Sequence, residues 1–175
     1  MDIDKKQLAN LLAKEDIRDL ALLYSRGVDR KDPKLLRTLY TEDATDTHGD
    51  TFDGSAGDYV DFLETAFPYM RYSGHHICNH LISVDGDQGE GEVYAVAYHV
   101  LPDGNDGWVE DLMCVRYLDN YQRCSDGRWR FAKRVVTYDM RNRRAITLSD
   151  DADASKEEPS YADFTHALFA RGGRH

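Results

Sequence analysis

The chain is poor in the features that mark secreted, membrane-spanning and nucleic-acid-binding proteins. Its 175 residues include only 3 cysteines and 4 prolines, and no apolar run reaches the ~18 residues that a membrane-spanning helix needs. Acidic residues outnumber basic ones, and the formal net charge of -10 argues against nucleic acid, which requires a basic surface, and disfavours anionic membranes. We therefore expect neither nucleic acid nor a membrane among its partners.

The cysteines are also isolated from one another in the sequence, at Cys78, Cys114 and Cys124. Three thiols cannot all pair within one chain, and their spacing fits neither a CxxC zinc site nor a disulfide framework. The first twenty residues lack the succession of basic, apolar and small residues that a signal peptide shows. The sequence therefore predicts a reduced, cytoplasmic protein.

The first part of the chain is helical in pattern. Apolar residues recur at helical spacing over residues 5–28, which predicts a long amphipathic helix. Asp32 followed by Pro33 is typical of the start of a second, short helix. Ser55 marks the start of a third, over about residues 55–69, because it begins an approximate capping box.

Strands and turns make up the rest. Residues 42–54 are expected to form a short strand and a turn, and four strands follow residue 71, with Asp-Gly hairpin signals at three of the reversals. Helices followed by an antiparallel meander indicate an α+β fold, a cone whose long curved sheet holds the helices on its concave side. We expect one domain over residues 1–141 and a charged tail or flap over 142–175.

Three histidines fall within the first long strand, in the segment GHHICNH at residues 74–80. Strand alternation places His75 and Asn79 on one face and His76 and His80 on the other. Imidazoles on two faces cannot meet at one ion, and no HxH or HExxH spacing is present, so we expect no metal site. His76 and His80 are expected to be solvated or at a subunit contact, and His99 to be structural.

Three segments, LYSRGVDRKDPKLLRTLYTEDA (23–44), HHICNHLISVDGD (75–87) and GRWRFAKRVVTYDMR (127–141), together resemble the SnoaL-like branch of the nuclear transport factor 2-like superfamily. The resemblance extends over nearly all of residues 8–141. It implies a cone with a deep pocket and no cofactor. Its better-understood members, scytalone dehydratase and the hexachlorocyclohexane dehydrochlorinases, are lyases built on an Asp–His pair.

The resemblance also implies roles for single residues. Asp29 matches the aspartate that orients the base, and His75 matches the histidine that removes a proton. Arg134 matches an arginine that lines the dehydrochlorinase pocket, and His48 falls near a pocket tyrosine of scytalone dehydratase. Tyr24 stands where the dehydrochlorinase has a lysine, which argues against dehalogenation and leaves Asp–His chemistry in place.

These residues suit an elimination. A carboxylate that accepts the proton of one imidazole nitrogen fixes the tautomer and stabilises the imidazolium that forms when the other nitrogen takes a proton from the substrate. Arg134 or the Tyr24 hydroxyl would hold the developing negative charge. The interpretation is a cofactor-independent lyase acting on a small aromatic or polyketide-like molecule, with dehydration as the default and retro-aldol cleavage or isomerisation as alternatives.

The residues alone leave other interpretations open. His75 would also be satisfied by a hydrogen bond in a polar cavity, and the same cone would serve as a non-catalytic binding module. A third possibility is a structural subunit, because small subunits of aromatic-ring dioxygenases share this fold and size. We expect self-association through the outer sheet face, as a trimer before a dimer, since a long exposed sheet would otherwise present apolar surface to water.

Overall fold

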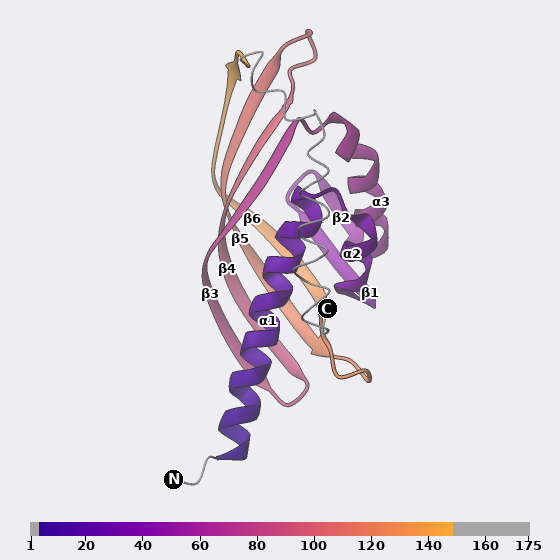
Figure 1. The fold of residues 1–175 in the computed structure, drawn as a ribbon, viewed down its shortest axis with the longest axis vertical. Coiled ribbons are helices and arrows are strands. Elements are labelled where there is room, and N and C mark those ends of the chain that lie inside the picture. The colour runs from indigo at the N-terminus through magenta and orange to yellow at the C-terminus, as the bar shows by residue number, and fades with distance from the viewer. Residues whose placement is uncertain (1–3, 149–175) are drawn as a thin grey trace, which may run out of the picture.

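The computed structural model describes residues 4–148, which form helices packed against one curved sheet (Figure 1). The helices are α1 (Lys5–Asp29), α2 (Pro33–Thr38), α3 (Ala56–Ala66) and the single 3-10 turn η1 (Phe67–Tyr69). The strands are β1 (Tyr40–His48), β2 (Phe52–Ser55), β3 (Tyr72–Asp85), β4 (Gln88–Pro102), β5 (Trp108–Arg123) and β6 (Trp129–Ile146).

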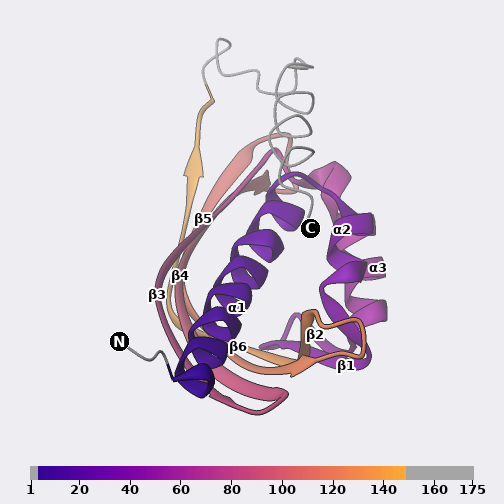
Figure 2. The same cartoon turned by 60° about the horizontal axis from the view of Figure 1, so that its bottom comes forward.

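The six strands form one open sheet in the order β2-β1-β6-β5-β4-β3. Strands β3 to β6 make the expected antiparallel meander, whereas β1 pairs with β6 in parallel. The sheet curls around α1, and α2 and α3 lie across the opening of the curve (Figure 2). This arrangement confirms the α+β cone predicted from the sequence.

The three Asp-Gly turns join the long strands as expected. Gly86, Gly104 and Gly127 have positive φ angles of 60°, 86° and 81°, which glycine adopts without a steric penalty. Strand β6 is longer than the sequence predicted, because its pairing with β5 continues to Ile146 opposite Trp108. The expected boundary at residue 141 therefore falls inside a strand, and residues 149–175 of the expected tail lie outside the described residues.

Helix α1 fills the concave side of the sheet with one apolar face. Asp4 caps its first turn by accepting a hydrogen bond from the Lys6 amide at 2.9 Å. The buried positions recur every three or four residues, as a helix that covers a sheet requires: Ala13, Ile17, Leu20, Tyr24 and Val28. Within residues 4–148, no helix combines the length and the apolar character that crossing a bilayer demands.

Strand β3 contains a bulge that the sequence did not reveal. Ile77 pairs with Ala95 and His80 pairs with Val93, so three steps along β3 match two along β4. One extra residue reverses the inward and outward positions beyond it. The prediction that His80 points outward was therefore wrong: its Nε2 lies 3.1 Å from the hydroxyl of the buried Tyr121. Leu81 takes the outward position and is 66% exposed.

Candidate active site

Asp29 and His75 form a hydrogen-bonded pair. Asp29 is the last residue of α1, and His75 lies near the start of β3. Oδ1 of Asp29 is 2.6 Å from Nδ1 of His75, and the His75 amide donates to Oδ2 at 2.9 Å. The Ser73 hydroxyl donates to Oδ1 at 3.0 Å. Within the described part of the chain Nε2 of His75 has no hydrogen-bond partner, so this nitrogen is available to a ligand.

These contacts keep the Asp29 carboxyl ionised. Burial by itself raises the pKa of Asp29, but the hydrogen bonds from His75 and Ser73 outweigh it, and the pKa lies below its ordinary value. An ionised acceptor at Nδ1 places the proton of neutral His75 on that nitrogen and leaves the lone pair on Nε2. The pair has the geometry of an oriented general base.

His75 opens into a cavity of about 170 Å³ between the sheet and the helices. Its wall is mostly apolar, with contributions such as Val28, Leu63, Met113 and Val136. An apolar cavity of roughly 150 Å³ holds one benzene molecule. The space therefore suits a ligand built on a single ring, with a few polar groups on the wall to orient it.

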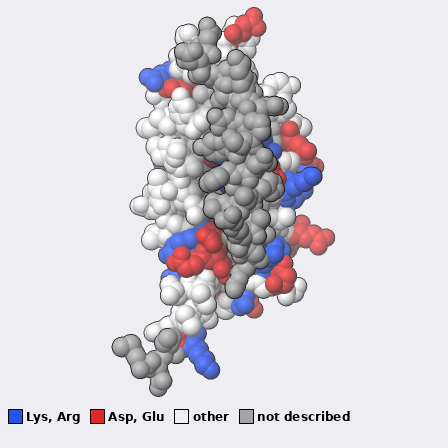
Figure 3. Space-filling model, viewed as in Figure 1, with Lys and Arg blue, Asp and Glu red and all other residues white. Residues whose placement is uncertain are grey.

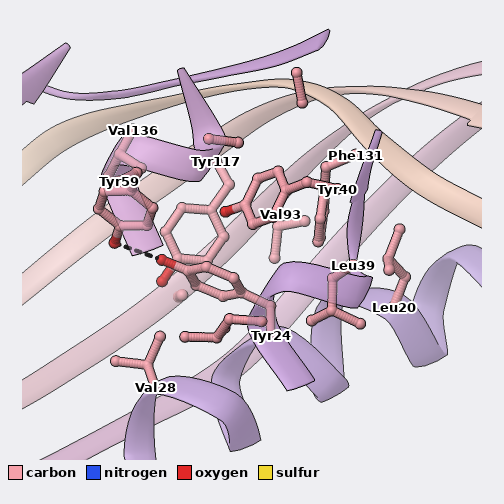
Figure 4. Close-up of a cluster of buried hydrophobic side chains, with 14 of the residues drawn as sticks. Leu20, Tyr24, Val28, Leu39, Tyr40, Tyr59, Val93, Tyr117, Phe131 and Val136 are labelled. Carbon is pink, nitrogen blue, oxygen red and sulfur yellow. Dashed lines mark hydrogen bonds between the residues drawn. The ribbon is translucent and has the colours of Figure 1, made fainter. Parts of the chain in front are cut away.

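A second Asp–His pair, from β1, reaches the same cavity through its histidine, His48. Nδ1 of His48 lies 2.5 Å from Oδ1 of Asp46, which is fully buried, and the Tyr40 hydroxyl donates to Oδ2 of Asp46 at 2.7 Å. On the other side of the ring, Nε2 of His48 is 2.9 Å from the Tyr59 hydroxyl and 3.3 Å from the Tyr24 hydroxyl. Tyr24 from α1 and Tyr59 from α3 also meet each other, at 2.9 Å (Figure 4).

The two tyrosine hydroxyls keep their protons. Burial raises the pKa of Tyr24, although the nearby Arg134 partly opposes it, and burial together with Tyr24 and Asp46 raises the pKa of Tyr59. Both side chains line the cavity. They therefore present hydrogen-bond donors, which is how a site holds an oxygen that gains negative charge.

Arg134 does not line the cavity as the resemblance implied. It is fully buried, and its Nε and one terminal nitrogen donate to Asp119 on β5 at 2.8 and 2.7 Å. Its guanidinium lies 4.1 Å from the ring centroid of Tyr24 and 4.4 Å from that of Tyr117. The cross-strand carboxylate holds the cation beneath these rings, so Arg134 contacts Tyr24, which lines the cavity, and does not line it itself.

The sequence matches a known protein family. The family model described as a SnoaL-like domain matches residues 9–135. The chain belongs to the SnoaL-like domain family. The resemblance noted in the sequence is thereby confirmed, and no curated protein gives a significant match.

Several solved structures share the fold at low identity. A type 2 hexachlorocyclohexane dehydrochlorinase has a TM-score of 0.71 at 21% identity, covering 81% of this chain and 96% of its own. The type 3 enzyme from Novosphingobium barchaimii LL02 has a TM-score of 0.68 at 23% identity, covering 79% and 95%. A provisional scytalone dehydratase from Novosphingobium aromaticivorans has a TM-score of 0.67 at 21% identity, covering 79% and 91%. At these identities the likeness shows the fold alone.

The SnoaL-like cavity also contains polar residues that sequence reasoning missed. His99 on β4 lies beside His75, with ring centroids 5.1 Å apart, and burial together with His75 lowers its pKa to about 4. Asp111 and Arg141 line the cavity as an ion pair, in which Nε of Arg141 donates to Oδ1 of Asp111 at 2.9 Å. The pairing of neighbouring strands brings these residues together. His99 on β4 is opposite Asp111 on β5, and Arg141 on β6 is opposite Met113, two residues after Asp111. A long-range register of this kind leaves no local signal.

Within residues 4–148, no group of three or more His, Cys, Asp and Glu side chains is placed to hold a metal ion. Of the five residues singled out from the sequence, the structure brings four to the cavity: Tyr24, His48, His75 through its imidazole, and Asp29 behind it. Arg134 alone lies beneath the wall.

Proposed function

We propose that this SnoaL-like protein is a cofactor-independent lyase that removes a proton from carbon in a small, single-ring oxygenated molecule. His75 is the general base, and Asp29 orients it and stabilises the imidazolium. The observation that carries the proposal is the Asp29–His75 pair, 2.6 Å apart, whose imidazole lines a mostly apolar, partly open cavity and whose Nε2 is unpaired within the described residues. The dehydratase and dehydrochlorinase names of its structural neighbours support this class.

The polar side chains of the cavity wall favour loss of water as the reaction. Removal of a carbon-bound proton leaves electrons that form a double bond as the leaving group departs with its own pair. The wall offers the two protonated tyrosine hydroxyls, Tyr24 and Tyr59, to an oxygen that becomes negative. Retro-aldol cleavage and double-bond isomerisation need the same base and the same donors, so they are the alternatives within this class.

The test compares substitutions at His75 and Asp29 with one at a neighbouring histidine. His75→Ala should lower turnover by roughly 100- to 10,000-fold, and Asp29→Asn by a comparable factor, because the first removes the base and the second removes the carboxylate that orients it. His76→Ala is the matched control, since His76 lies next in the same strand and is exposed. Turnover is followed by proton NMR in heavy water with a β-hydroxy ketone carrying one phenyl ring, which reports both deuterium exchange and elimination.

Circular dichroism and urea unfolding of each variant establish that the fold is intact. Turnover by His75→Ala at the rate of the unmodified protein would contradict the assignment of the base. A ligand that is returned chemically unchanged, with an affinity insensitive to Asp29→Asn, would identify a binding module in place of an enzyme.

A further inference from the structure

The cavity holds a second set of acid–base groups that the action of His75 does not use. Asp46 is fully buried, and His48 has only 15% of its side chain exposed, so the carboxylate and the ring nitrogen meet 2.5 Å apart out of contact with bulk water. Tyr40 donates a further hydrogen bond to Asp46 at 2.7 Å. A buried carboxylate with two such partners holds the imidazole that it contacts in a fixed orientation, with Nδ1 toward Asp46 and Nε2 toward Tyr59.

A chain of short contacts leads from that imidazole to the cavity. Nε2 of His48 lies 2.9 Å from the Tyr59 hydroxyl, and the Tyr59 hydroxyl lies 2.9 Å from that of Tyr24. The order of groups is therefore Asp46, His48, Tyr59 and Tyr24, with both tyrosines in the cavity wall. Each neighbouring pair is within hydrogen-bond distance, which is what transfer of a proton along the chain requires.

The two Asp–His pairs lie on different sides of the cavity. His48 is on β1 and His75 is on β3, and strands β6, β5 and β4 separate them in the sheet. Four strand-to-strand steps amount to about 19 Å along the sheet surface, which curls so that both side chains reach one cavity. A ligand in that cavity therefore has the base His75 on one side and the hydroxyls of Tyr24 and Tyr59 on another.

We propose that Asp46, His48, Tyr59 and Tyr24 form a proton relay that serves as the general acid of the reaction, opposite the base His75. This inference rests on the proposed function and adds to it the source of the second proton. It assigns the substrate to molecules whose leaving group is a hydroxyl, which departs as water only when it receives a proton.

The step balances in protons and electrons. Nε2 of neutral His75 takes the proton from carbon, and the electrons of that bond form the carbon–carbon double bond. The carbon–oxygen bond breaks with its electron pair on oxygen, which accepts the Tyr24 proton and leaves as water. Tyr59 replaces the Tyr24 proton, and the imidazolium of His48 replaces that of Tyr59. His75 then loses a proton to solvent and His48 regains one, which restores the starting state.

Arg134 supports the relay from below. Its guanidinium lies 4.1 Å from the Tyr24 ring centroid, and one of its terminal nitrogens is buried without a hydrogen-bond partner among residues 4–148. A permanent cation at this distance stabilises the negative charge that builds on the Tyr24 oxygen while its proton is in transit. Arg134 is a positioning residue for this step, since it does not reach the cavity.

The experiment separates the acid from the base by changing the leaving group. The probes are the β-hydroxy ketone with one phenyl ring and its β-chloro counterpart, since chloride departs without a proton. His48→Gln and Tyr59→Phe should slow loss of water by roughly 100-fold or more. Loss of chloride and deuterium exchange at carbon should change by less than about 10-fold, because His75 is intact. Equal losses with both probes would overturn the relay.

Controls come from a similar contact outside the cavity. His80 and Tyr121 meet at 3.1 Å, and neither lines the cavity, so His80→Gln and Tyr121→Phe measure the general effect of removing a buried His–Tyr hydrogen bond. Both should leave the ratio of the two elimination rates unchanged. His75→Ala should lose deuterium exchange and both eliminations, and retention of all three would contradict the proposed function. The relay is judged separately, by the difference between loss of water and loss of chloride in His48→Gln and Tyr59→Phe.

A binding measurement tests the relay without turnover. Substituted phenols of increasing acidity mimic an oxygen that gains negative charge, and one ring fits the cavity. Affinity should rise with phenol acidity in the unmodified protein, and this dependence should flatten in Tyr59→Phe and His48→Gln but not in Tyr121→Phe. An unchanged dependence in the first two variants, or no binding of any phenol to the unmodified protein at millimolar concentration, would overturn the proposal.

Discussion

His99 is a cavity residue whose protonation opposes folding. Its ring lies beside His75, and burial is the first cause that lowers its pKa, to about 4. The unfolded chain has an ordinary histidine pKa of about 6.5, so between these values the unfolded state binds the additional proton. Stability contributed at this position therefore rises as the pH increases from about 4 to about 6.5, and is lost as the pH falls through the same window.

His99→Gln should remove that dependence. From about pH 7.5 to about pH 5.5, the unmodified protein should lose about 1 kcal/mol more of its free energy of unfolding than the variant, measured in urea. His80 also has a pKa lowered to about 4 by burial, so some loss persists in the variant. His76→Gln, at an exposed position, should follow the unmodified protein, and parallel curves for His99→Gln and the unmodified protein would contradict the prediction.

At the same scale, the residues that sequence reasoning located are those with a local or family signal. Asp29 and His75 were identified through the family resemblance, and the structure brings them together at 2.6 Å, while their catalytic role stays a proposal. The burial of Arg134 could not be read from the sequence, because alternation leaves the choice between it and Lys133 open. Asp119 holds Arg134 inward through two hydrogen bonds; it is 15 residues away in sequence and opposite Arg134 in the β5–β6 ladder.

The position of Asp29 depends on how closely α1 and α2 approach each other. Gly27 lies two residues before Asp29, and a Cβ atom there would be 2.7 Å from Cδ2 and 2.9 Å from Cγ of Leu36. Leu36 is fully buried, so its side chain has no free space into which it can move. The absence of a side chain at Gly27 lets the short helix α2 fold back against the end of α1, which fixes the carboxylate that holds His75.

Gly27→Ala should therefore destabilise the protein by about 1–3 kcal/mol, since overpacking of a filled site exceeds the helix-propensity gain of alanine. It should also reduce turnover by displacing Asp29. Gly57→Ala in α3 is the matched control, because its Cβ would meet only the Ser55 Oγ at 3.8 Å; it should be neutral or slightly stabilising. Urea unfolding measures both, and an equal response of the two variants would contradict this account of the helix contact.

The bulge in β3 shows why strand positions were only partly predicted. The period of two holds from His75 to Ile77, and the extra residue between Ile77 and His80 shifts every later side chain to the other face. No glycine or proline lies in that segment to mark the change. The helices, in contrast, are marked by local signals, namely the helical period and the capping residues. Asp32 caps α2 and Ser55 caps α3, as expected.

Across the whole molecule, that shift places Leu81 in a row on the outer face of the sheet that also contains Leu118 and Val135, with Glu92 between the two leucines. Leu81 is opposite Glu92, Glu92 is opposite Leu118, and Leu118 is opposite Val135. Leu81 and Leu118 are 66% and 42% exposed. In the view of Figure 3 the surface over β3 is largely without Lys, Arg, Asp and Glu, although the chain as a whole has a net charge of -10. Such a surface favours contact with a second copy of the chain.

We predict that this outer face is the surface through which the protein self-associates, as a trimer before a dimer. Leu81→Glu and Leu118→Glu should each shift the protein to a monomer, because burial of an unpaired carboxylate at the contact costs more than the lost apolar area. Leu12→Glu is the matched control: Leu12 is 56% exposed on α1, away from the sheet face.

Sedimentation velocity and light scattering at tens of micromolar measure the mass of each variant, and deuterium exchange by His75 should persist in the monomers, since the cavity opens on the concave side of the sheet. A monomeric unmodified protein, or an assembly that survives both glutamates and is lost in Leu12→Glu, would place the contact elsewhere. In the latter case the exposed leucines of α1 would be the interface. The row on the sheet would then face solvent, since Glu92 lies between Leu81 and Leu118 and forms an ion pair with Arg116.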